Sequence, residues 1–378
     1  MIEIVAFVAG IVLLGAVAWD VFETIVVPRP TPGVFRLGRY IVRGSWSLVR
    51  HIGTRSGERR ERLLGLFAPA TTIALLVTWL GGLVLGYGLV LFAIRDELRP
   101  SPMDLGTAIY FGATSVVTLG FGDVVPVGGA ARLVVAAAAL SGLGVVALVI
   151  TFLFSLFASY QRREVAVVTL QAKAGAPPSA VVLLESLARL DLVDHLPDFF
   201  GGWERWIAEV LDSHVAYPLL GYFRSSHDGV SWISALGTVL DTASLVVTTI
   251  EGVPRGQAEL VTKMGAHLVE DITNLGFRAK GTDGVDRDSF DAVHARLAAA
   301  GYRLVPAEQA WPAFSRARST YAEALDAMAA YWAVPAAAWF GGSRASHPAT
   351  SPDRPSVTGG SEVRSSAEDV APLPSDGP

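Results

Sequence analysis

The chain has 378 residues, of which 51% are hydrophobic and only 17% charged, and its mean hydropathy is +0.44. Cysteine is absent, which excludes disulfides, thiolate metal sites and catalytic thiols. The formal net charge of −5 gives no overall reason to expect a nucleic acid as partner. The apolar excess lies in residues 1–160, so we expect a membrane part joined to a soluble part.

Residues 1–27 are the first long apolar run, with Asp20 and Glu23 near its far end. About 20 apolar residues cross a bilayer, so this run predicts an N-terminal transmembrane helix. A cleaved signal peptide is the alternative, but the basic n-region is missing and the apolar run continues past the small residues at 16–18. Acids are costly in lipid, so both are expected near the interface or paired with an arginine of the next segment.

Residues 28–62 form a basic segment with nine arginines and two glutamates. The positive-inside rule makes this segment cytoplasmic and puts the N-terminus outside. Between Val34 and Ile52, aromatic and aliphatic residues are mixed with arginines, which predicts an amphipathic helix on anionic inner-leaflet lipids. A voltage-sensor helix is the alternative. It needs arginines within an apolar run that spans the membrane, and this segment contains no such run.

Residues 63–94 and 133–161 are two further uncharged runs, each long enough to span a bilayer. Between them, residues 105–117 are apolar but too short to span, and Asp104 is the expected cap of a helix there. This order predicts a re-entrant half-helix between two spans. The dipole of such a helix favours a cation at its carboxyl end.

The half-helix leads into a segment made of Thr118, Leu119, Gly120, Phe121, Gly122 and Asp123. Carbonyl groups that point at one axis require dihedral angles that glycine adopts at little cost, which gives both glycines a physical role. The threonine hydroxyl adds a further oxygen ligand, and the aspartate places negative charge at the mouth. A Gly-rich turn between helices is the alternative, and the flanking spans argue against it.

The sequence of residues 118–123 resembles the selectivity filter of potassium channels, usually written TVGYGD. The resemblance covers about residues 64–160 and implies an outer helix at 63–94, a pore helix at 105–117, the filter at 118–123 and an inner helix at 131–160. It implies K⁺ as the permeating ion, coordinated by residues 118–122, with no cofactor and no other metal. One strand cannot surround an ion, so a homotetramer is expected.

Two residues depart from the usual filter. Leu119 replaces valine, which is conservative. Phe121 replaces tyrosine, and so lacks the hydroxyl that ties the filter of many family members to a pore-helix aromatic; the matching positions hold Tyr110 and Phe111. This difference affects filter rigidity more than selectivity, because the coordinating atoms are backbone carbonyls.

The predicted inner helix contains candidate gating residues. Gly142 and Gly144 are candidate hinges, since glycine weakens a helix by about 1 kcal/mol; close packing against a neighbouring helix is the alternative. Phe154 and Phe157 are the candidate gate, within an apolar set that also contains Phe152, Leu153 and Leu156. Lipid-facing aromatic residues are the alternative to a gate.

Residues 161–340 predict a helical cytoplasmic domain, and residues 341–378 predict a disordered tail. Helices are expected near residues 163–173, 179–190, 202–222, 231–250, 257–275, 288–300 and 306–332. Residues 239–250 are apolar but too few to span, which favours a buried core helix. The domain lacks a GxGxxG run, so nucleotide-type regulation is not expected. Its five histidines lack metal-ligand spacing.

These features predict an all-α, multi-pass protein of the cell membrane with its C-terminus in the cytoplasm. The predicted function is passive, K⁺-selective conduction modulated by the cytoplasmic domain, rather than enzymatic activity. Two alternatives remain open. One is a weakly selective cation channel, and the other is a membrane-anchored sensor or binding protein with a vestigial pore.

Overall fold

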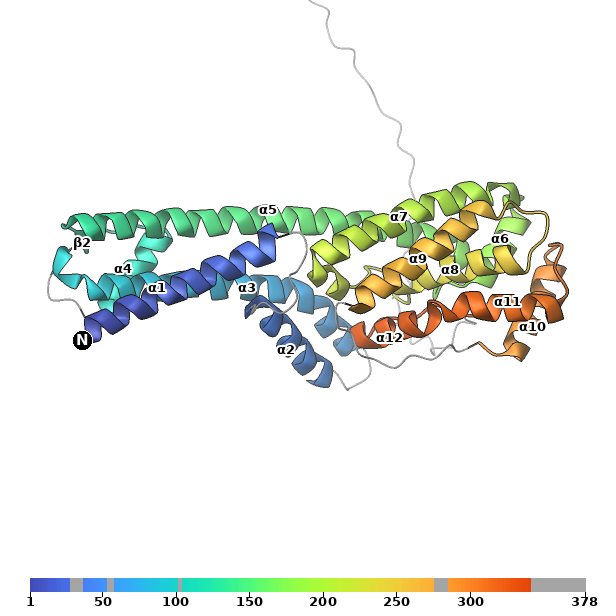
Figure 1. Ribbon diagram of the computed structural model, residues 1–378, viewed down its shortest axis with the longest axis horizontal. Coiled ribbons are helices and arrows are strands. Elements are labelled where there is room, and N and C mark those ends of the chain that lie inside the picture. The colour runs from blue at the N-terminus through green and yellow to red at the C-terminus, as the bar shows by residue number, and fades with distance from the viewer. Residues whose placement is uncertain (28–36, 53–57, 101–103, 275–284, 341–378) are drawn as a thin grey trace, which may run out of the picture. The chain divides into compact units, whose positions relative to one another are not determined.

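The computed structural model is predominantly α-helical, which confirms the predicted fold class (Figure 1). It describes residues 1–27, 37–52, 58–100, 104–274 and 285–340. Within these ranges, three helices are long and apolar enough to cross a membrane: Ile2–Val26, Arg60–Ala93 and Gly129–Ala174. The predicted disordered tail and much of the loop before the amphipathic helix lie outside the described residues.

Helix α1 (Ile2–Val21) continues into a π-helical turn, η1 (Phe22–Val26), and packs along α3 (Glu58–Ala93). The two backbones approach closely because glycines face each other: a Cβ on Gly10 would lie 2.7 Å from the carbonyl oxygen of Gly86. At the opposite side of α3, a Cβ on Gly88 would lie 2.8 Å from Ile109 of α4 (Leu105–Val116). Small residues thus let α3 pack between α1 and α4.

Asp20 is buried between α1, α3 and the start of α2 (Leu37–Ile52). Its carboxylate accepts hydrogen bonds from the Trp79 indole at 2.8 Å and from the Gly38 amide at 3.2 Å. The sequence predicted an interfacial position or an arginine partner for this group. The partners that the structure gives are an indole and the amino terminus of α2, which sequence spacing does not reveal.

Helix α2 was predicted to lie on the membrane surface, yet one of its faces packs into the protein. Trp46 is only 3% exposed and contacts the rings of Phe67 at 4.9 Å and Tyr222 at 5.1 Å. On the opposite face Tyr40 and Leu48 are exposed. The amphipathic pattern therefore serves a protein contact on one side and leaves the other side open.

The loops around α4 are tied to the next span. After η2 (Arg95–Glu97), strand β1 (Leu98–Arg99) pairs antiparallel with β2 (Val125–Pro126). The Glu97 carboxylate accepts a hydrogen bond of 2.9 Å from the amide of Ala131, in the first turn of α5 (Gly129–Ala174). These contacts close the loop that leaves the filter segment.

Helix α5 is continuous over 46 residues, which corresponds to about 69 Å. The expected boundary at residue 160 therefore does not coincide with the end of a helix. Arg162 and Arg163 mark a change in polarity, but the helix continues to Gly175, which ends it with a φ of 81°. A length of about 69 Å exceeds the roughly 45 Å of a whole bilayer, so one helix joins both halves of the chain.

The part of the chain that follows α5, predicted to be cytoplasmic, is a bundle around α8. Its elements are α6 (Ala180–Arg189), η3 (Val193–His195), α7 (Leu196–Ala216), η4 (Pro218–Tyr222), α8 (Trp232–Thr248), α9 (Gly256–Asn274), α10 (Arg287–Ala299), α11 (Ala307–Ser319) and α12 (Ala322–Trp332). Residues 232–246 of α8 are all buried, which confirms the buried-core interpretation of this apolar run.

Two predicted helix boundaries in the bundle are wrong. The helix expected from residue 202 begins at Leu196, because Pro197 fits the first turn of α7, where a missing amide donor costs nothing. Residues 306–332 form two helices instead of one, with a break before Tyr321. The turn places the Tyr321 side chain in the core, where its hydroxyl donates to Asp241 at 2.8 Å.

Candidate ion-conduction site

Helix α4 delivers the chain to residues 118–123. Asp104 caps its amino end, accepting a 2.8 Å hydrogen bond from the amide of Thr107, as the sequence predicted. At its carboxyl end, the amide of Thr118 donates to Ser115 O at 3.1 Å and that of Leu119 donates to Thr114 O at 2.8 Å. The first two residues of the segment are therefore anchored on the last turn of the helix.

Beyond this anchor, positive φ angles occur at every second residue. Thr118, Gly120 and Gly122 have φ values of 60°, 57° and 81°. Alternation between left- and right-handed residues turns successive peptide planes the same way, so neighbouring carbonyl groups share one side of the strand instead of alternating. The first of these residues is β-branched and therefore strained at positive φ. Such a backbone suits a row of oxygen ligands.

The side chains of this segment make few contacts within the chain. Leu119 is 57% exposed and Phe121 is 66% exposed. In the described chain, a Cβ added at Gly120 or Gly122 meets no atom within 4 Å. One face of the segment is thus left open by a single copy of the chain.

Tyr110 supplies a contact that the sequence did not predict. Its hydroxyl lies close to the carboxylate of Asp123, two residues beyond Phe121. The pore-helix aromatic therefore approaches the end of the filter segment even without a tyrosine at position 121. The signal was present in the sequence as the two adjacent aromatic residues, but which atom they reach depends on the fold.

Gly142 and Gly144, the candidate hinges, have different surroundings. A Cβ on Gly142 would lie 2.0 Å from the carbonyl oxygen of Val116, at the end of α4, while one on Gly144 meets nothing within 4 Å. Gly142 is therefore a close-packing position beneath the filter segment. Neither glycine interrupts α5.

The apolar set predicted as a gate divides into two groups. Phe152 and Leu156 are buried against the protein, with Phe152 5.5 Å from the Tyr217 ring. Phe154 is 74% exposed, and Phe157 is 41% exposed and lies 5.9 Å from the Phe223 ring. The two candidate gate residues are thus the outward-facing members, and Phe157 also contacts the helical bundle that follows α5.

A resident metal site finds no support among the described residues, where no group of three or more His, Asp or Glu is placed to bind an ion. His214 is buried, and burial, followed by the charge of Arg163, lowers its pKa to about 3. His294 lies 2.9 Å from the carbonyl oxygen of Val305. These two histidines therefore have structural partners.

Comparison with known proteins gives one match. Residues 68–159 match the family model Ion_trans_2, described as "Ion channel". The match covers most of α3, all of α4, the filter segment and the first two thirds of α5. Neither the curated proteins nor the solved structures gave a match. This part of the chain is therefore similar to ion channels, while α1, α2 and the helical bundle after α5 lie outside the match.

Proposed function

We propose that the protein is a K⁺-selective channel of the cell membrane in which four copies of the chain surround one pore. The alternating φ angles of Thr118, Gly120 and Gly122 support this proposal most directly. They turn the carbonyl groups of residues 118–122 to one side, where they replace the water shell of the ion. The similarity of residues 68–159 to ion channels supports the same role.

The open face of the filter segment supports the tetramer. A single strand provides ligands on one side of an ion only, and the exposed Leu119 and Phe121 side chains leave room for neighbouring copies. Cyclic symmetry of four such strands closes the ring of ligands. The segment is then buried between protein and ion, as backbone at membrane depth requires.

The orientation and partners follow from charge. The N-terminus is outside and the arginine-rich segment 28–62 faces the anionic lipids of the inner leaflet. The cytoplasmic bundle then continues directly from α5 and modulates its movement. No resident cofactor is needed for passive conduction.

Flux through liposomes containing purified protein tests the proposal. We expect K⁺ flux to exceed Na⁺ flux by at least about 100-fold, because carbonyl ligands discriminate between the ions. Gly122→Ala places an L-residue at a φ of 81°, at about 1–2 kcal/mol per copy, so summed over four copies K⁺ flux falls more than about 100-fold. Gly129→Ala, at an open helical position, is the matched control.

The outcomes separate the candidates. Equal fluxes of K⁺ and Na⁺ identify a weakly selective cation channel. A wild-type protein that is folded and tetrameric but passes neither ion favours a membrane-anchored sensor with a vestigial pore. Normal K⁺ flux through Gly122→Ala contradicts the assignment of residues 118–122 as the ion ligands.

A further inference from the structure

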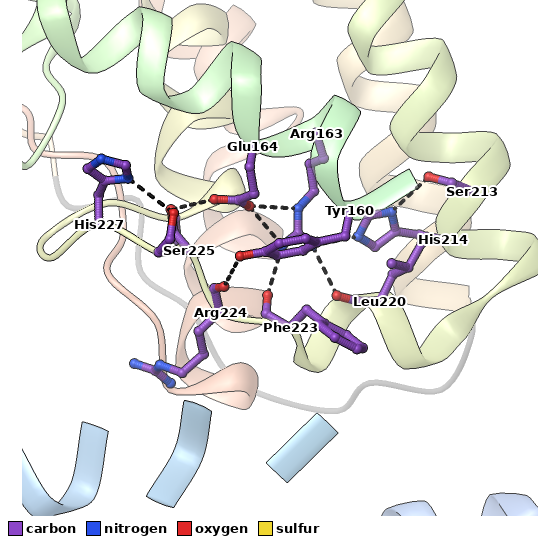
Figure 2. A network of polar contacts seen from close by, with 12 residues as sticks. Tyr160, Arg163, Glu164, Ser213, His214, Leu220, Phe223, Arg224, Ser225 and His227 are labelled. Carbon is purple, nitrogen blue, oxygen red and sulfur yellow. Dashed lines mark hydrogen bonds and ion pairs between the residues drawn. The ribbon is translucent and has the colours of Figure 1, made fainter. Parts of the chain in front are cut away.

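A short turn between α7 and α8 contacts four other parts of the chain. It comprises residues 217–225 and includes η4; we call it the junction turn. Its partners come from α5, α3, α2 and the end of α12, and Figure 2 shows the part of this network around α5. No local pattern predicted such a role, because an arginine pair at the end of an apolar run indicates only a membrane boundary.

Arg163 of α5 holds the backbone of the junction turn. The guanidinium is 2% exposed and donates to the carbonyl oxygens of Leu220 at 3.0 Å and Phe223 at 2.8 Å (Figure 2). Its Nε and Nη2 also donate to Glu164 Oε1 at 3.0 and 2.9 Å. A buried charge is stable only when its donors are satisfied, and here two of the acceptors are main-chain groups of the turn.

His214 of α7 completes the surroundings of the guanidinium. Its Nδ1 lies 2.9 Å from the carbonyl oxygen of Val210 and therefore carries the proton. Nε2 then accepts from Arg163 Nη1 at 3.3 Å. The indole of Trp206 donates to the main-chain oxygen of Arg163 at 3.2 Å, so α7 fixes this residue from both its main chain and its side chain.

A second set of contacts ties the turn to α5 just before Arg163. The Tyr160 hydroxyl donates to the carbonyl oxygen of Arg224 at 3.1 Å. The Phe223 ring lies 5.5 Å from the Tyr160 ring and 5.9 Å from that of Phe157, one of the candidate gate residues. The junction turn therefore contacts α5 along about two turns of the helix.

The same turn also contacts α3, α2 and α12. Arg224 donates to Glu61 of α3 at 2.6 Å and to the carbonyl oxygen of Ala333, just after α12, at 2.9 Å. Tyr222 packs 5.3 Å from the Phe67 ring of α3 and 5.1 Å from Trp46 of α2. Outer helix, inner helix and cytoplasmic bundle thus meet on one segment of nine residues.

We propose that Arg163 is a positioning residue that locks the inner helix to the junction turn, and that the turn sets the spacing of α3 and α5 at the cytoplasmic end of the pore. This inference rests on the proposed channel function and names the place where the bundle regulates it. Since the turn holds both helices, a rearrangement of α7 or α12 moves α5 against α3. Release of Arg163 removes this control without touching the filter.

Arginine is required because its planar fork reaches two carbonyl oxygens and a carboxylate at once, which lysine cannot do. Arg163→Lys should therefore behave like Arg163→Gln. Arg162→Gln is the matched control, since Arg162 is adjacent, of equal charge, exposed, and bonded only to Ser159 Oγ at 3.1 Å among the contacts that the structure gives for its side chain.

Single-channel recording of the full-length protein in bilayers tests the proposal. We expect Arg163→Gln and Arg163→Lys to change the open probability at least tenfold, with unitary conductance and the ratio of K⁺ to Na⁺ permeability unchanged. Arg162→Gln should stay within twofold of wild type. Hydrogen exchange of residues 217–225 should quicken at least tenfold in the Arg163 variants and remain unchanged in the control.

Tyr160→Phe keeps the test valid if the Arg163 variants do not assemble, because it removes one hydroxyl and keeps the ring. It should shift the open probability in the same direction by a smaller factor. The proposal is overturned, with the channel function intact, if an Arg163 variant has faster hydrogen exchange in the junction turn but the open probability of wild type. Where the Arg163 variants do not assemble, a wild-type open probability in Tyr160→Phe overturns it. Absence of K⁺ current through the wild-type protein contradicts the proposed channel function. In that case hydrogen exchange still tests the contact, and unchanged exchange of residues 217–225 in the Arg163 variants refutes it.

Discussion

The filter segment and helix α8 differ sharply in how far a single copy of the chain buries them. Residues 232–246 of α8 are all buried by other parts of the same copy, whereas Leu119 and Phe121 of the filter are 57% and 66% exposed. The core of the bundle is thus complete in one chain, whereas the filter segment is left open by a single copy. If the proposed channel is correct, substitutions near the filter segment act through assembly and conduction, while substitutions in the bundle act through the stability of each copy.

Helix α5 connects the filter region to the core of the bundle. Its first part packs Gly142 beneath the end of α4, and its last part contributes Val167 and Leu170 to the core of the bundle. The same rigid element therefore belongs to the incomplete pore and to the complete core. Three predictions sharpen this comparison, from the largest expected effect to the smallest.

Gly142→Ala should disrupt the pore half most strongly. Its Cβ would lie 2.0 Å from Val116 O, a main-chain atom that cannot rotate away, so we expect a loss of about 3 kcal/mol or more per copy. The measurement is retention of the tetramer on heating, together with K⁺ flux.

Gly144→Ala is the control for this prediction, because it meets nothing within 4 Å and improves helix propensity. Packing at Gly142 predicts a large difference between the two variants. Equal retention of the tetramer, with reduced opening in both, supports hinges instead.

His214 should make the bundle sensitive to acid. Its pKa of about 3 in the folded protein lies below the ordinary value of 6.5, chiefly because of burial, so the unfolded chain binds the proton first. Stability is fully present above pH 6.5 and falls as the pH drops from 6.5 towards 3. We expect about 2 kcal/mol to be lost between pH 7 and pH 5, measured by thermal unfolding.

His214→Gln isolates this contribution, since glutamine accepts from Arg163 and donates to Val210 without titrating. Its unfolding should depend less steeply on pH than that of wild type over this range. Parallel curves for the two proteins contradict the assignment of a neutral, buried imidazole.

Tyr110→Phe should give the smallest effect. It removes the hydroxyl that lies close to Asp123 and leaves the ring in place. We expect current to decline several-fold faster during sustained opening, with ion selectivity unchanged. Tyr87→Phe, which removes a hydroxyl 3.1 Å from Ser141 Oγ outside the filter, is the control; an equal effect of both variants would argue against a brace at the filter.

Local patterns predicted much of the pore half. Uncharged runs marked the spans, Asp104 marked the start of α4, and Gly120 and Gly122 marked positive φ angles, because hydropathy, capping and glycine conformation depend on neighbouring residues. The bundle was predicted as helical for the same reason. Its errors fell at Pro197 and Tyr321, where a first-turn proline and a buried side chain overrode the local signal.

The sequence by itself thus determined the order of spans, the half-helix and the glycine-rich strand, all of which follow from residues close together in the chain. Only the tertiary structure decided that Trp46 is buried, that Gly142 packs on Val116 and that Arg163 reaches the junction turn 57–60 residues away. The local sequence around an arginine pair is the same whether the side chains face lipid headgroups or donate to main-chain carbonyls. Its partners are set by long-range packing, which no local pattern encodes.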